Sequence, residues 1–238
     1  MFPSGHMRIA VVGPRGFVGS KICSESLKRG WSVLGIDRNT PDKINLLEKA
    51  DAVAFAVGSF STNTAYKSAV NSTLSPCALK KLVSARFDSN PLQSKSLLEL
   101  NYAPVVDTVK LLAQAKGLGV SDASTNHNNE QLGTSNIDQY QGSSKIPFVY
   151  ISANPWALSS TEYIDSKRQA EHFLASKPYL RAAFVRPKFI RPDVDYRFSV
   201  RDFLDLELKY IDPKCTSQYV AEKVCDAIES GAEGPINL

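Results

Sequence analysis

Short apolar runs alternate along most of the chain with segments in which apolar residues recur at helical spacing. Runs rich in β-branched residues cover 8–12, 31–36, 51–57, 146–152 and 180–185. Runs of this length, bounded by turn-forming residues, are typical of buried strands. Three- and four-residue apolar spacing predicts helices over 18–29, 96–116, 161–176, 198–210 and 216–229. Strands that alternate with helices predict an α/β fold with a parallel sheet.

Several segments depart from this alternation. The connection 38–50 has room for one short helix that starts at Pro41, although a doubly wound sheet usually has a further strand and helix at this point. Residues 60–95 are polar and predict one or two short helices. Residues 119–145 are rich in Ser, Asn, Gln and Gly, which predicts a long surface insertion that is flexible alone or ordered by a partner. Pro104 predicts a kink near the start of its helix.

Composition and charge narrow the function classes. The chain has 238 residues, of which 43% are hydrophobic, and this is enough for one well-cored domain with a small annex. The net charge of +4 is spread along the chain, which argues against a nucleic-acid partner. No run of 18 apolar residues occurs, so no membrane span is predicted. The four cysteines and three histidines lack metal-ligand spacing, and the cysteines indicate a reducing intracellular or organellar compartment.

Three glycines follow the first predicted strand at three-residue intervals, namely Gly13, Gly16 and Gly19. In such a turn the first glycine allows a sharp bend and the second leaves room for a pyrophosphate. The third lets the following helix pack closely on the strand, and the helix N-terminus then attracts the anion. A second strand ends at Asp37, roughly 20 residues further on, where an acid can bind a ribose hydroxyl. This context predicts a dinucleotide-binding site.

A second constellation begins the helix that follows strand 146–152. Tyr163 and Lys167 are four residues apart, which places the phenol and the ammonium on one helix face. A lysine there can hold ribose hydroxyls, and its charge favours the phenolate, lowering the tyrosine pKa toward the range useful for acid–base chemistry. Both residues are therefore candidates for a catalytic role, functional or vestigial.

Together these segments resemble the short-chain dehydrogenase/reductase superfamily, and more closely its extended and atypical branches. The likeness covers most of the chain and rests on GPRGFVG, the segment before Ser59, LELN, FVYISA, YIDSKRQAEHFL and FVRPKFI. It implies a shortened, Rossmann-type, doubly wound parallel sheet that binds NADP(H) or NAD(H). The cofactor-binding residues implied are Gly13, Arg15, Gly16, Phe17, Val18, Gly19, Asp37, Arg38, Ala56, Val57, Gly58, Asn101, Ser152, Tyr163, Lys167, Arg186 and Pro187.

Departures from the superfamily pattern bear on activity. Catalytic members carry a Ser or Thr where this chain has Ala153, and Ser152 lies one residue early, where a strand side chain points to the opposite face. Arg15 either reaches a cofactor phosphate or points into solvent. Asp37 favours NAD(H) and Arg38 favours NADP(H), so the nucleotide stays open at this point.

The resemblance divides the chain into an NAD(P)-binding domain over 1–190, with the insertion 119–145, and a reduced annex over 191–238 that ends in a short segment after Gly234. It implies two functions. One is a non-catalytic accessory subunit of a mitochondrial respiratory assembly of complex I type, on the matrix side of the inner membrane, where peripheral membrane association is allowed. The other is an NAD(P)H-dependent reductase of ubiquinone biosynthesis, in which Tyr163 is the general acid and Lys167 orients the ribose.

Overall fold

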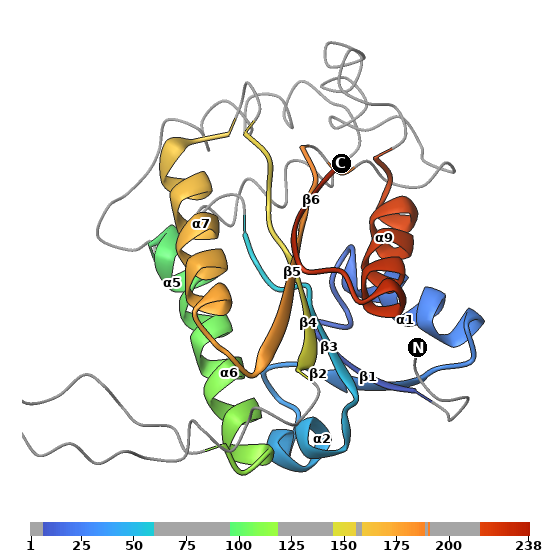
Figure 1. Ribbon diagram of the computed structural model, residues 1–238. Helices are drawn as coiled ribbons and strands as arrows, with labels where there is room; N and C mark the ends of the chain where they lie inside the picture. Colours follow the sequence, from blue (N-terminus) through green and yellow to red (C-terminus); the bar gives the residue numbers. More distant parts are fainter. Residues whose placement is uncertain (1–6, 60–95, 119–144, 156–158, 189, 191–214) are drawn as a thin grey trace, which may run out of the picture.

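The fold is built on a six-stranded, wholly parallel sheet in the order β2-β1-β3-β4-β5-β6 (Figure 1). The computed structural model describes residues 7–59, 96–118, 145–155, 159–188, 190 and 215–238. The strands are β1 (Arg8–Val12), β2 (Ser32–Ile36), β3 (Ala52–Phe55), β4 (Ile146–Ile151), β5 (Leu180–Arg186) and β6 (Gly234–Asn237). All four residues of β3 and all six of β4 are buried, as expected for central strands covered on both faces.

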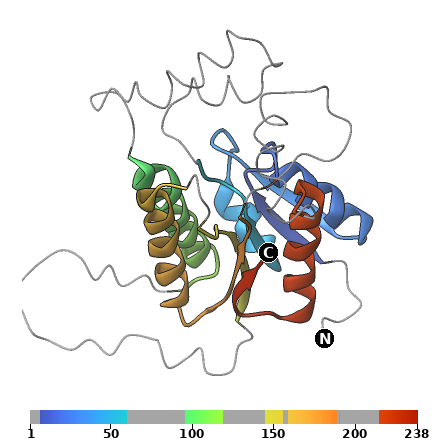
Figure 2. The same cartoon turned by 90° about the horizontal axis from the view of Figure 1, so that it is seen from above.

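Helices cover both faces of the sheet. They are α1 (Gly19–Lys28), α2 (Lys43–Lys49), α5 (Leu97–Asn101), α6 (Ala103–Ala115), α7 (Thr161–Ala175) and α9 (Ser217–Ser230). Helices α1 and α9 pack together on one face, and α5, α6 and α7 lie on the other, as the view from above shows (Figure 2). This three-layer arrangement confirms the predicted Rossmann-type α/β class.

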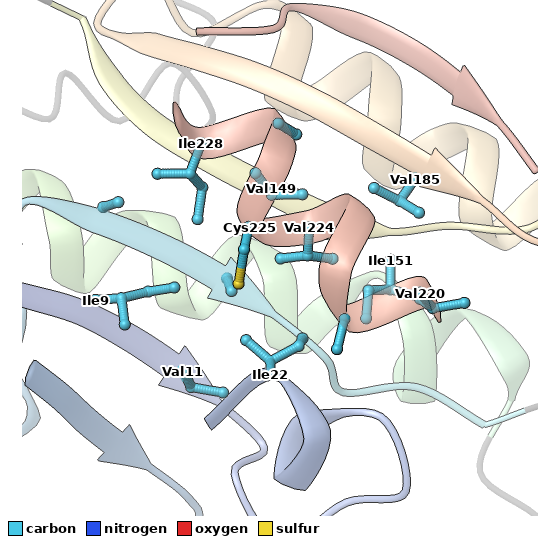
Figure 3. Close-up of a cluster of buried hydrophobic side chains, with 14 of the residues drawn as sticks. Ile9, Val11, Ile22, Val149, Ile151, Val185, Val220, Val224, Cys225 and Ile228 are labelled. Atoms are coloured by element: carbon cyan, nitrogen blue, oxygen red, sulfur yellow. The ribbon is translucent and has the colours of Figure 1, made fainter. Parts of the chain in front are cut away.

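Alternate residues of the strands feed two separate hydrophobic cores. Ile9, Val11, Val149 and Val185 point toward α1 and α9, where they meet apolar side chains of both helices (Figure 3). On the other face, Ala10, Phe55, Phe148, Tyr150 and Phe184 pack with Leu47, Val105, Val109, Leu112 and Leu174. The cores join the helices to the strands on which the site is built.

The predicted strands and helices that fall within the described residues are confirmed, with small shifts at their ends. The connection after β2 contains α2 alone, which begins at Lys43 after an Asp42 cap and not at Pro41. Within the described sheet β2 is an edge strand, so the predicted loss of a strand and helix unit is confirmed. The long helix predicted over 96–116 is two helices, α5 and α6, because Pro104 lies in the first turn of α6.

The sequence predicts only a short segment after Gly234, but in the structure Gly234–Asn237 is strand β6. Residues of β6 pair in parallel with β5, from Ala183 opposite Gly234 to Arg186 opposite Asn237. Helix α9 packs on α1 and lines one of the two cores. This part of the predicted annex is therefore built into the sheet. The predicted helix 198–210, the segment 60–95 and most of the insertion 119–145 lie outside the described residues.

Candidate nucleotide-binding site

The glycine loop connects β1 to α1 at the carboxyl end of the sheet. Gly13 has a φ of 86°, and its N–H donates to the Ile36 carbonyl at 2.8 Å. A Cβ on Gly13 would lie 2.8 Å from Cγ2 of Val57, and one on Gly19 would lie 2.0 Å from the Gly13 carbonyl oxygen. Neither position can accept a side chain, so the loop lies close both to its own helix and to the segment after β3.

The N-terminus of α1 faces this loop without a protein group that neutralises it. No side chain caps Val18, and no acidic residue lies in the first turn. Phe17 is partly exposed and Val18 is buried. The N–H groups of Ser20, Lys21 and Ile22 donate to carbonyls of the loop and the first turn. The positive end of the helix dipole, with no acidic residue in the first turn, still suits a pyrophosphate at a glycine turn, so the residues present fit the expected cofactor.

The end of β2 carries an ion pair. Arg15 of the glycine loop lies 2.6 Å from Oδ2 of Asp37, although 76% of its side chain is exposed. Oδ1 of Asp37 accepts from the Asn39 N–H at 2.9 Å and from the Thr40 hydroxyl at 3.1 Å. The Asn39 hydrogen bond is the main cause of a lowered Asp37 pKa. Arg15 therefore reaches back over Asp37, and Arg38 is exposed beside it.

Helix α7 brings Tyr163 and Lys167 to the carboxyl end of β4. The Lys167 ammonium is buried, donates to the Ile151 carbonyl at 3.1 Å, and lies over the rings of Tyr150 at 4.9 Å and Tyr163 at 5.9 Å. Burial lowers the pKa of Lys167 to about 7. Burial also raises the pKa of Tyr163 to about 12, so the expected lowering of the tyrosine pKa is wrong for this structure. Desolvation of the phenolate outweighs the lysine charge.

Gly58 and Asn101 meet at the Lys167 ammonium. A Cβ on Gly58 would lie 2.7 Å from the lysine Nζ and 2.8 Å from Oδ1 of Asn101, so only glycine leaves both groups in place. The buried Asn101 side chain accepts from the Ser59 N–H at 2.9 Å and donates to the Ser59 carbonyl at 3.0 Å and the Ser166 hydroxyl at 3.2 Å. Asn101 thus fixes the segment after β3 against α7. The Ala56 N–H of that segment donates to the Val12 carbonyl at 2.9 Å.

Ser152 is held by a side chain that sequence reasoning missed. Its hydroxyl accepts from Nη1 of Arg168 at 3.2 Å, and Nη2 of Arg168 donates to the Ala153 carbonyl at 2.8 Å. Ser152 and Ala153 are both buried. The hydroxyl that lies nearest in sequence to the absent catalytic serine is therefore engaged by the protein itself.

Arg168 belongs to a larger charged network. The Glu171 carboxylate, only 5% exposed, accepts from Arg168 at 2.6 Å and from two nitrogens of Arg186. These hydrogen bonds raise the pKa of Arg186. Arg186, a predicted cofactor-binding residue, ties β5 to α7 through these bonds. The adjacent Pro187 carbonyl accepts from the Asn154 N–H at 2.8 Å. The i,i+3 spacing of Arg168 and Glu171 was the one signal for this network in the sequence.

The predicted residues thus form two groups. The glycine loop, Val57, Gly58, Asn101 and Lys167 follow one another along the carboxyl ends of β1, β3 and β4. Ser152, Arg186 and Pro187 lie on the β5 side, in the Arg168–Glu171 network. In the described part of the chain, no cluster of three or more His, Cys, Asp and Glu side chains is arranged to hold a metal ion. No described helix is long and apolar enough to cross a bilayer.

Comparison with known proteins agrees with this geometry. The model of the NAD dependent epimerase/dehydratase family matches residues 9–185. This match confirms the predicted superfamily and the NAD(P)(H) cofactor. A protein of Saccharomyces cerevisiae, MIOREX complex component 2, is 25% identical over an alignment that covers 87% of this chain and 82% of the yeast protein.

Solved structures show the same fold. The dTDP-4-dehydrorhamnose reductase of Bacillus anthracis, in complex with NADP, is 12% identical with a TM-score of 0.55, over 100% of this chain and 76% of the other. The UDP-glucose 4-epimerase of Thermus thermophilus, in complex with NAD, is 16% identical with a TM-score of 0.54, over 97% of this chain and 77% of the other.

Proposed function

Because the chain belongs to the NAD-dependent epimerase/dehydratase family, we propose that it holds NADP(H) or NAD(H) as an accessory subunit of a larger assembly. One observation carries the non-catalytic part of this proposal. Ala153 stands where the family resemblance expects Ser or Thr, and Arg168 engages the Ser152 hydroxyl. Ala153 has no hydroxyl, and the Ser152 hydroxyl is buried against Arg168, so neither residue is placed to polarise a substrate carbonyl.

The residues along the carboxyl ends of the strands would hold the nucleotide. Gly16 and the N-terminus of α1 suit the pyrophosphate, Arg15 and Asp37 the adenosine ribose, and Lys167 the other ribose. A bound nicotinamide nucleotide supplies hydride chemistry when a substrate is present. In the accessory function it supplies binding free energy instead, because a ligand that binds only the folded state stabilises it.

Membership of a complex is supported by the yeast relative, whose name describes a complex component. We place the assembly in mitochondria, as a respiratory complex of complex I type on the matrix side of the inner membrane. This finer placement rests on the superfamily resemblance.

A reductase of ubiquinone biosynthesis is the second candidate, and one observation favours it. Tyr163 and Lys167 lie together on α7, with the ammonium 5.9 Å from the phenol ring. With a pKa of about 12 the phenol is protonated at neutral pH but is a weaker acid than an ordinary tyrosine, so it is the placement of the pair, and not the pKa, that favours this candidate. In this function Tyr163 would donate the proton to the substrate oxygen.

Two substitutions separate the candidates. We expect Gly16→Asp to abolish nucleotide retention, because it puts a carboxylate against the pyrophosphate, and to destabilise the protein in its assembly. For the accessory subunit, Tyr163→Phe leaves assembly and bound nucleotide unchanged. The measurement is gentle isolation from the native source, with bound nucleotide and co-migrating proteins quantified. Loss of cellular function in Tyr163→Phe with assembly intact would favour the reductase instead.

A further inference from the structure

Tyr150 lies beneath the Lys167 ammonium, next to the carboxyl end of β4. Its side chain is fully buried, and its ring packs against that of Phe55 with centroids 5.8 Å apart. The lysine Nζ is 4.9 Å from the Tyr150 centroid, closer than it is to the Tyr163 ring. The ring face is thus presented to a charge that has almost no contact with water.

The Tyr150 hydroxyl does not explain why a tyrosine occupies this position. It is the one buried side-chain polar atom among the described residues that has no hydrogen-bond partner. A buried hydroxyl without a partner destabilises the folded state, and phenylalanine would fill nearly the same space without it. Any benefit of the residue therefore comes from its ring.

Few other groups in the described part of the chain stabilise the Lys167 ammonium, so its contact with the Tyr150 ring is important. The one hydrogen bond that the described residues give the ammonium goes to the Ile151 carbonyl. From its own helix, Tyr163 lies 5.9 Å away and Glu171 acts on it electrostatically, but the Glu171 carboxylate is already bonded to Arg168 and Arg186. From β4 comes Tyr150, and α5 and the segment after β3 contribute only the uncharged Asn101 and Gly58.

We propose that Tyr150 is a positioning residue for Lys167, whose ring face holds the ammonium charged and beside Gly58, ready to receive the nucleotide. A desolvated ammonium over an aromatic face is stabilised electrostatically by the ring quadrupole. The ring also limits the directions that the long lysine side chain can take. The inference rests on nucleotide binding at this site, as proposed above.

The test compares Tyr150→Phe with Tyr150→Leu by measuring the Kd of NADPH and NADH in the full-length protein. Phenylalanine keeps the ring and should leave both Kd values within about twofold, while raising the melting temperature. Leucine removes the ring and should weaken the tighter nucleotide by roughly fivefold to thirtyfold. Should the leucine variant fail to fold, Tyr150→Met fills more of the space and serves in its place.

Two further measurements distinguish positioning from general damage. In a Lys167→Met background, the change from Phe to Leu at position 150 should alter Kd by less than about twofold, because the ammonium is gone. The pH at which affinity falls, as Lys167 loses its proton, should be about one unit lower in the leucine variant than in the phenylalanine variant.

Three results would contradict the proposed role of Tyr150. Equal Kd values for the phenylalanine and leucine variants would overturn the positioning role. The role would also be overturned if the change from Phe to Leu weakened nucleotide affinity equally with Lys167 and with Met at position 167. That result would show that the ring acts only on packing. Failure of the unsubstituted protein to bind either nucleotide would overturn the proposed function itself, and this inference with it.

Discussion

The two ends of the site, the glycine loop and the β4–α7–β5 region, are formed in different ways. The glycine-loop end uses backbone: at Gly13 and Gly19 there is no room for a side chain, and α1 leaves its N-terminus uncapped. The β4–α7–β5 end uses side chains from distant parts of the sequence, with Lys167 on Ile151 and Glu171 between Arg168 and Arg186. The first end can only bind an anion, whereas the second places an amine and a phenol where chemistry could occur.

This difference separates the backbone that suits the pyrophosphate from the side chains that could take part in chemistry, of which Lys167 is also a proposed nucleotide contact. The binding end keeps every glycine that its geometry requires. The chemical end keeps Tyr163 and Lys167 but has Ala153 in place of the expected hydroxyl, with Ser152 bonded to Arg168. Substitutions at the two ends should therefore affect different properties, and they can be ranked by the size of their effect.

The largest effect is expected at the glycine-loop end, from Gly19→Ala. Its Cβ would lie 2.0 Å from the Gly13 carbonyl oxygen, so β1 and α1 must separate. We expect a loss of about 3 kcal/mol or more in the free energy of unfolding, together with loss of nucleotide binding. The measurement is urea unfolding with and without NADPH.

Gly30→Ala is the matched control for that substitution. Gly30 ends α1 with a φ of 77°, but a Cβ there would meet nothing within 4 Å. Backbone strain alone should cost about 1 kcal/mol and leave the nucleotide Kd unchanged. If both alanine variants were equally stable, close packing of the loop would not be what requires glycine.

A smaller effect is expected at the other end, from Glu171→Gln. Glu171 is 5% exposed and accepts from two arginines, so its neutralisation leaves two partly buried cations without a counter-charge. We expect a loss of about 2 kcal/mol in the free energy of unfolding, measured by denaturant titration.

The control for Glu171 is Glu162→Gln on the same helix. Glu162 is exposed in the first turn of α7, where its charge interacts only with the helix dipole. Its loss should cost about 0.5 kcal/mol. Equal effects of the two substitutions would mean that the Arg168–Glu171–Arg186 network does not tie β5 to α7.

The same contrast explains how much the sequence could predict. Buried strands, the glycine loop and the i,i+4 pair of Tyr163 and Lys167 are local patterns, and the structure confirms the elements that carry them. Strand β6 was missed because Gly234 and Pro235 weaken a strand pattern, and only its pairing with β5 stabilises it. The links of Arg168 to Ser152 and of Arg186 to Glu171 join residues 15 or 16 positions apart, a spacing that no local pattern reveals.

The pKa of Tyr163 shows a second kind of limit. The residue types correctly predicted that a cation lies near the phenol. They did not predict that both groups are buried deeply enough for desolvation to raise the tyrosine pKa and lower the lysine pKa. Burial is a property of the folded core, so the balance between charge and desolvation becomes visible only there.

The smallest effect is expected at Arg15 and Asp37, where the sequence alone does not decide between NADP(H) and NAD(H). Both oxygens of Asp37 are engaged, Oδ2 by Arg15 and Oδ1 by Asn39 and Thr40, so the carboxylate has less accepting capacity left for a ribose hydroxyl. With Arg15 offsetting its charge and Arg38 exposed beside it, the net local charge is positive and favours a 2′-phosphate.

We therefore expect NADPH to bind about tenfold more tightly than NADH. Arg15→Gln should reduce that preference by roughly threefold to fivefold, since an exposed charge contributes modestly. Lys49→Gln, at the exposed end of α2, removes a charge of the same sign and should leave the preference unchanged. Tighter binding of NADH by the unsubstituted protein would show that Asp37, and not the arginines, decides which nucleotide is bound.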